Sequence, residues 1–245
     1  MMTIDAKGVY YRELNQEVRA AIAAGETDIV LDNVNGQRYI ADGVRAKVNI
    51  TVNGVPGNDL AAFMDGPTLT VNGNVQDGVA NTMNDGKVVI NGNAGDVLGY
   101  GMRGGKLYIK GDVGYRVGIH MKGYKQNIPV VIAGGTAGDF FGEYMAGGIL
   151  MLLGLGREEG APIAGDYIGT GMHGGVMYIR GEVDLSRCGA EVGTMEMTDE
   201  DDKVLDTYLG EFCSDTGCDM DEIMKVKFTK LYPKSSRPYG RLYAY

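Results

Sequence analysis

Residues 99–123 read GYGMRGGKLYIKGDVGYRVGIHMKG, and variants of this stretch recur along most of the 245-residue chain. A methionine marks the same point of each variant: Met64, Met83, Met102, Met121, Met145 and Met172. The first three intervals are 19 residues and the next two are 24 and 27, which is one period with two short insertions. A fixed period of this size indicates one structural unit that is repeated and stacked.

Each repeat contains a short apolar run bounded by glycines. Examples are Lys87–Ile90, Lys106–Ile109 and Val176–Ile179, which are rich in β-branched and aromatic residues and too short for helices. We therefore predict strands, with alternate side chains pointing into a coil and away from it. The 40 glycines suit the corners between such strands, because glycine adopts positive φ without a Cβ clash.

These features predict an all-β fold: a right-handed parallel β-helix of about seven to eight coils over residues 28–183. One four-residue strand cannot bury its apolar face alone, whereas stacked coils enclose a continuous core. A left-handed β-helix built on hexapeptides is disfavoured because the chain has no six-residue period.

The two ends of the chain depart from the repeat. Residues 1–27 form a predicted capping segment, in which Arg12–Ala24 has the apolar stripe of an amphipathic helix. Residues 184–245 form a predicted helical, basic and aromatic extension. In it, Thr198 is an N-cap followed by acidic residues, and a second short helix begins at about Asp219.

Three further segments are candidates for binding a partner or ligand. The insertions Tyr124–Ile128 and Arg157–Ile163 are either binding loops or tolerated surface loops. Lys225–Tyr245 carries six basic residues and no acidic one, interleaved with tyrosines. This arm either docks an acidic partner or lies back over the acidic surface of its own chain.

Composition excludes several classes of protein. A net charge of −9 argues against nucleic acid as a partner, since phosphate binding needs a basic surface. No stretch approaches roughly 18 unbroken apolar residues, so we expect neither a membrane span nor a signal peptide, and a cytoplasmic location. Three cysteines, Cys188, Cys213 and Cys218, fit a reducing compartment and lack the spacing of a metal site.

The pattern G-x-G-x-x-G occurs twice, from Gly99 and from Gly169. Dinucleotide binding through this motif needs a helix directly after it, with its N-terminus at the pyrophosphate. Here the predicted strands of the repeat follow instead. We therefore interpret both matches as corners of the solenoid and predict no cofactor bound to this chain.

Four other residues are candidates for chemistry. Asp77 and Asp96 occupy equivalent turns, and paired carboxylates of this kind cleave glycans in some enzymes. Tyr115 takes the equivalent place in the next coil, so we expect the series to stop there, and turn capping is the better explanation of both aspartates. His120 and His173 follow glycine-rich corners and are expected to hydrogen-bond locally. We therefore predict no catalytic residue and no metal ligand.

The repeated GYGMRGGKLYIKG and GTGMHGGVMYIRG, with matching glycines, methionines and apolar positions, resemble the GXGXG domain over about residues 18–183. This β-helical domain ends the large subunit of glutamate synthase and also occurs in the C subunit of formylmethanofuran dehydrogenase. As a separate chain it is similar to the third component of the archaeal-type, split glutamate synthase. The positions that match the motif are Gly99, Gly101, Met102, Gly104, Gly105, Gly169, Gly171, Met172, Gly174 and Gly175.

The resemblance implies a scaffold rather than an enzyme. In that family the domain packs against amidotransferase and synthase components, and FMN and iron–sulfur clusters belong to those partners. The tail from Thr198 is more similar to the glutamate synthase branch than to the formylmethanofuran dehydrogenase branch. Two alternatives stay open: a carbohydrate-active β-helix using Asp77 and Asp96, and a self-associating structural protein.

Overall fold

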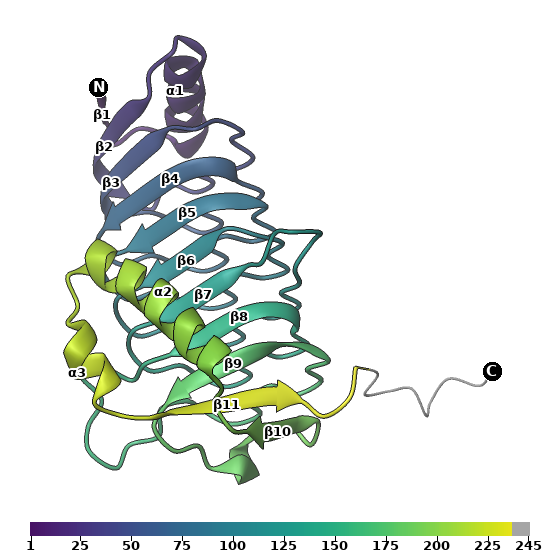
Figure 1. The fold of residues 1–245 in the computed structure, drawn as a ribbon. Helices are drawn as coiled ribbons and strands as arrows, with labels where there is room; N and C mark the ends of the chain where they lie inside the picture. The colour runs from purple at the N-terminus through teal and green to yellow at the C-terminus, as the bar shows by residue number, and fades with distance from the viewer. Residues whose placement is uncertain (237–245) are drawn as a thin grey trace.

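The computed structural model describes residues 1–236, whose elements are drawn in Figure 1. The strands of the repeat are β1 (Met2–Asp5), β2 (Asp28–Asn35), β3 (Asn49–Val55), β4 (Asp65–Asn72), β5 (Asp85–Ile90), β6 (Lys106–Ile109), β7 (Val130–Ala133), β8 (Ala146–Leu152) and β9 (Gly174–Arg180). The other elements are α1 (Tyr11–Ala23), η1 (Leu185–Arg187), β10 (Val192–Met195), α2 (Asp199–Thr216), α3 (Met220–Met224) and β11 (Phe228–Pro233).

Strands β1 to β9 pair in parallel and in chain order, so neighbouring coils are joined strand to strand along the whole series. Figure 1 shows them as a ladder running from the N-terminal end to β9. The predicted all-β parallel solenoid is therefore confirmed. The number of coils, the right-handed sense and the boundaries at residues 28 and 183 stay predictions.

The strands place alternate side chains on two faces, as the apolar runs predicted. In β6, Leu107 and Ile109 are fully buried in the core that the coils enclose. Tyr108, between them, belongs to a second apolar cluster on the outer face of the sheet. One short strand thus contributes to two cores.

Helix α2 covers the outer face of the later strands only, as Figure 1 shows. Its Leu205, Leu209 and Phe212 pack in the second cluster. One column of outward residues explains this position: Thr51, Thr70, Val89, Tyr108, Ile132, Met151 and Tyr178 are successive partners. The column is polar in β3 and β4 and becomes apolar or aromatic from β5, so α2 lies where burial is favourable.

The two ends of the solenoid are built differently. At the N-terminal end, Leu14, Val18 and Ala21 of α1 are buried in the inner core. At the other end, β11 pairs antiparallel with β9 and with β10. Strand β11 uses part of the basic arm, which the sequence did not predict to be a strand. Residues 237–245 of that arm lie outside the described residues.

Candidate functional site

The G-x-G motif is a turn with left-handed backbone at alternate residues. Val97, Gly99 and Gly101 have φ of 60°, 65° and 57°. Turns of this kind begin at Tyr39, Asp59, Gly78, Val97, Arg116, Phe140 and Tyr167. The amide of Gly99 donates back to the carbonyl of Val79 at 2.8 Å, and that of Val97 donates forward to Tyr115 at 2.8 Å. These N–H groups join coils, whereas a phosphate cradle needs them free.

The residues after the turn close the corner before the next strand. Met102 is fully buried. A Cβ on Gly104 would stand 2.3 Å from the carbonyl oxygen of Asn84, and Gly105 has φ of 76° directly before β6. A strand therefore follows the motif in the structure, which agrees with the interpretation of these glycines as corners.

The second copy of the motif has the same geometry. Gly169 and Gly171 have φ of 64° and 71°, Met172 is fully buried, and Gly175 has φ of 80°. A Cβ on Gly174 would lie 2.2 Å from the carbonyl oxygen of the preceding coil. In both copies, therefore, Gly104 and Gly174 pack against the backbone of the preceding coil.

Val97 is a β-branched residue in the left-handed region, which is strained. The equivalent residue of the preceding coil is Gly78, with φ of 73°. We expect Val97→Asn to raise the free energy of unfolding by about 1 kcal/mol, because asparagine tolerates this conformation. Thermal denaturation measures this gain in the stability of the variant. Val55→Asn, at an exposed strand end with ordinary φ, is the control and should show none; equal effects of the two changes would contradict strain at Val97.

The turn aspartates hold neighbouring coils together. Asp77 Oδ1 accepts the amide of Asp96 at 2.9 Å, and Asp96 Oδ1 accepts the amide of Tyr115 at 2.8 Å. The series resumes beyond Tyr115, where Asp139 accepts the amide of Asp166 at 2.9 Å, contrary to the expectation that it stops. This contact gives both candidate carboxylates a structural role in the turns.

The two histidines lie in the turns, where their surroundings differ. His173 Nδ1 is 3.0 Å from the carbonyl oxygen of Gly171, the local hydrogen bond that the sequence predicted. His120 is held by rings instead: it stacks on Tyr144 at 5.3 Å and meets the edge of Tyr100 at 5.7 Å.

Cys188 and Cys213 have the properties of structural thiols. Burial raises the pKa of Cys188 and of Cys213 to about 11, which disfavours the reactive thiolate. Within residues 1–236 no three His, Cys, Asp or Glu side chains gather as metal ligands would. In the same part of the chain, no helix combines the length and apolar character needed to cross a membrane.

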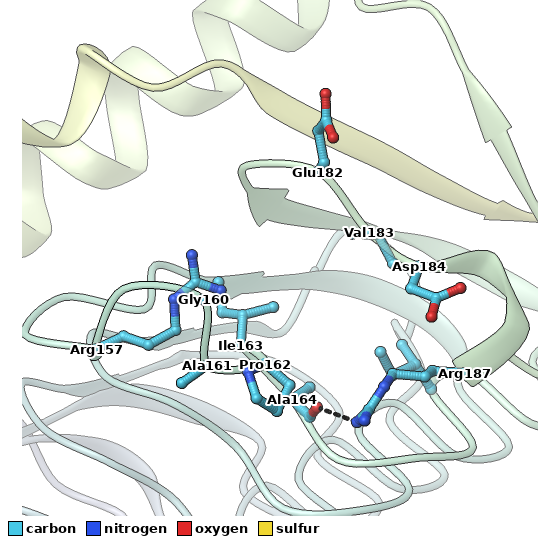
Figure 2. Close-up of a pocket in the computed structure, with 11 residues that line it drawn as sticks. Arg157, Gly160, Ala161, Pro162, Ile163, Ala164, Glu182, Val183, Asp184 and Arg187 are labelled. Carbon is cyan, nitrogen blue, oxygen red and sulfur yellow. Dashed lines mark hydrogen bonds between the residues drawn. The ribbon is translucent and has the colours of Figure 1, made fainter.

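The insertion Arg157–Ile163 borders a cavity of about 400 Å³ (Figure 2). Arg157 and Arg187 stand on opposite sides of its apolar floor, and Asp184 lies on the wall. Arg187 already pairs with Asp166 at 3.4 Å and donates to a main-chain carbonyl. Because the walls carry charges of both signs, this arrangement selects no class of ligand.

Sequence reasoning missed the polar contacts that fasten the C-terminal extension. Asp201, in the first turn of α2, accepts a hydrogen bond from Tyr178 at 2.6 Å and pairs with Lys230 of β11 at 2.7 Å. Burial alone would raise the pKa of Asp201, but hydrogen bonds from Lys230, Tyr178 and Thr198 hold it well below its ordinary value. The acidic residues after Thr198 were the signal for these contacts in the sequence. The partners of Asp201 could not be read there, because they lie on strands that the fold brings to the helix.

Comparison with known proteins agrees with this geometry. The family model described as "GXGXG motif" matches residues 13–236. The chain is also 47% identical over 255 aligned positions to the uncharacterized protein MJ1350 of Methanocaldococcus jannaschii, which covers 99% of this chain and 96% of that protein. The match extends over nearly the whole solenoid and the helices that follow it. The chain therefore belongs to the GXGXG motif family.

Proposed function

We propose that this chain is a non-catalytic scaffold subunit of a split, glutamate synthase-type complex in the cytoplasm. In that complex, separate amidotransferase and FMN/iron–sulfur synthase subunits make glutamate from glutamine and 2-oxoglutarate. The chain itself carries no cofactor and supplies a rigid surface on which these subunits pack.

The observation that carries this role is the family match over residues 13–236, which suggests a subunit related to glutamate synthase. The geometry is compatible with it. The amides of the motif turns donate hydrogen bonds to carbonyls of neighbouring coils. The two candidate carboxylates, Asp77 and Asp96, accept hydrogen bonds from backbone amides. A stack of coils joined in this way is suited to holding partners at a fixed separation.

Two other functions remain as alternatives. The C subunit of a formylmethanofuran dehydrogenase-type complex belongs to the same scaffold class and differs in its partner, a molybdenum or tungsten pterin enzyme. A carbohydrate-active β-helix belongs to another class, and the backbone contacts of Asp77 and Asp96 disfavour it. Self-association into a homo-oligomer is compatible with either scaffold role.

Reconstitution tests the proposed role. The purified chain alone should not convert glutamine and 2-oxoglutarate to glutamate, whereas adding it to the amidotransferase and synthase subunits should raise the glutamine-dependent rate. Ammonia-dependent synthesis is the control, because it bypasses the amidotransferase. Glutamate formation by the chain alone, or an unchanged rate on its addition, would refute the scaffold role.

A further inference from the structure

The N-terminal end of the solenoid carries an unusual surface, which we call the arginine–tyrosine surface. Its residues are Tyr10, Tyr11, Arg12, Arg19, Arg38 and Tyr39. Helix α1 and the first turn of the solenoid enclose a cleft of about 270 Å³ there, lined by Tyr11, Arg12, Asn15, Gln16, Arg19, Tyr39 and Asp42. In Figure 1 this end lies opposite the α3 and β11 end.

The positive charge of this surface is poorly neutralised. Among the described residues, no carboxylate lies within 4.0 Å of Arg12, Arg19 or Arg38. Arg12 donates to the hydroxyl of Tyr11 at 3.2 Å, and Arg19 donates to the main-chain carbonyl of Asp42. Burial raises the pKa of the Asp42 carboxyl, which lies near Arg19. Three arginines are therefore available to a partner on a chain whose net charge is −9.

Helix α1 separates its charges by position. Arg12, Gln16 and Arg19 are four and three residues apart, so they share one side of the helix, and all three line the cleft. Glu13 and Glu17 are absent from the cleft lining. The cleft side of α1 is therefore basic, although the helix as a whole is not.

Exposed tyrosines accompany the arginines. The ring centroid of Tyr11 is 4.6 Å from that of Tyr10 and 5.8 Å from that of Tyr39. Tyr10 is 53% exposed and Tyr39 is 38% exposed. Tyr39 also has φ of 60°, the left-handed conformation that begins each turn of the solenoid. Tyrosine and arginine are, with tryptophan, enriched among the residues that contribute most to binding between proteins.

Asn15, which lines the cleft, joins α1 to the first turn of the solenoid. Asn15 donates through Nδ2 to the carbonyl of Arg38 at 2.8 Å, which fixes the orientation of its amide. Its Oδ1 is buried and has no hydrogen-bond partner. Buried polar atoms in native proteins are rarely left in this state. Because this oxygen is buried, it is not accessible to a ligand in the cleft.

We propose that the arginine–tyrosine surface docks an acidic segment of a partner polypeptide. Carboxylates of that segment pair with Arg12, Arg19 and Arg38, and its backbone packs on the tyrosines. The inference rests on the proposed function in one respect, that a partner subunit exists. The family match begins at residue 13 and therefore does not include Tyr10, Tyr11 or Arg12 of this surface.

Binding of fluorescent poly-L-glutamate to the full chain tests this surface. The double variant Arg12→Glu/Arg38→Glu should bind about tenfold more weakly than the unaltered chain at low salt, because two attractive charges become repulsive. The control is Arg157→Glu/Lys203→Glu, which makes the same charge change at exposed residues outside the surface and should bind as the unaltered chain does. All four residues are exposed, so equal melting temperatures verify folding.

Several results would overturn the inference. One is equal binding of the two double variants. Another is tighter binding of polyuridylate than of poly-L-glutamate, which would make the surface a nucleic-acid site. A third is a dimer of the unaltered chain in sedimentation equilibrium that Arg12→Glu/Arg38→Glu abolishes, which would make the occupant a second copy.

Capture from native cell extract separates this inference from the proposed function. A partner subunit should be captured by both chains, but it should dissociate from Arg12→Glu/Arg38→Glu at a lower salt concentration than from the unaltered chain. Equal retention by both would refute docking at this surface and leave the scaffold role standing. If the unaltered chain retained no flavin-containing partner, the scaffold role would be refuted. Poly-L-glutamate binding would still test whether the arginine–tyrosine surface binds an acidic segment.

Discussion

Gly174→Ala is expected to lower the free energy of unfolding by about 3 kcal/mol, the upper end of the usual cost of overpacking. An added Cβ would stand 2.2 Å from the carbonyl oxygen of Ala146 and 2.7 Å from its carbonyl carbon. These are backbone atoms of the neighbouring coil, so no side chain can rotate away. Separating the coils would break the amide contacts of Gly174 and His173 with Met145.

Thermal or urea denaturation followed by circular dichroism measures this loss. For a chain of this length, about 3 kcal/mol corresponds to a fall in melting temperature of roughly 10 °C. Gly210→Ala is the matched control, because Gly210 lies exposed in α2 with nothing within 4 Å of an added Cβ. That change should stabilise the chain by about 0.5–1 kcal/mol. Equal melting temperatures for the two variants would contradict the backbone packing described for the motif.

Asp201→Asn is expected to lower the free energy of unfolding by about 3 kcal/mol. The Lys230 ammonium, whose side chain is 15% exposed, would lose its counter-charge at 2.7 Å. Tyr178 would keep an acceptor, so the loss arises from the unpaired charge and the weakened N-cap at Thr198. We expect the extension to loosen from β9 as a result.

The effect of Asp201 depends on pH in a defined direction. Its pKa is lower in the folded chain than the ordinary value of 3.8. Its stabilisation is therefore fully present above the unfolded value and is lost as the pH falls through the lower, folded value. The difference between the unaltered chain and Asp201→Asn should stay constant near neutral pH and shrink below about pH 4.

Two further variants isolate the cause. Asp202→Asn, at an exposed position of the same helical turn, should change stability by less than about 0.5 kcal/mol. Asp201→Asn/Lys230→Met should recover part of the loss, because removing both partners leaves no buried charge unpaired. A double variant as unstable as Asp201→Asn would show that the ion pair is not the source.

The periodic part of the fold was predictable from the sequence. Glycine and methionine recur every 19 residues, and the runs between them alternate, so strand positions and inward-facing residues such as Leu107 and Ile109 follow from local pattern. Left-handed turns at bulky residues such as Phe140 carry no such signal, because the neighbouring coils impose that conformation.

Contacts between distant segments were not predictable. Strand β11 joins the sheet because β9 presents a free edge at the last coil, which no local pattern records. Likewise Asp201 meets Tyr178 of β9 and Lys230 of β11, which lie 23 and 29 residues away in the sequence, only in the folded sheet. The arginine–tyrosine surface arises in the same way, since α1 brings Tyr11 to Tyr39.

Isolation of the chain from native extract under gentle conditions, with mass spectrometry and a visible spectrum of what accompanies it, tests the scaffold role most directly. We expect flavin and iron–sulfur absorbance together with synthase and amidotransferase subunits. A pterin–metal partner would instead assign the chain to the formylmethanofuran dehydrogenase branch. A colourless chain isolated alone would contradict the scaffold role.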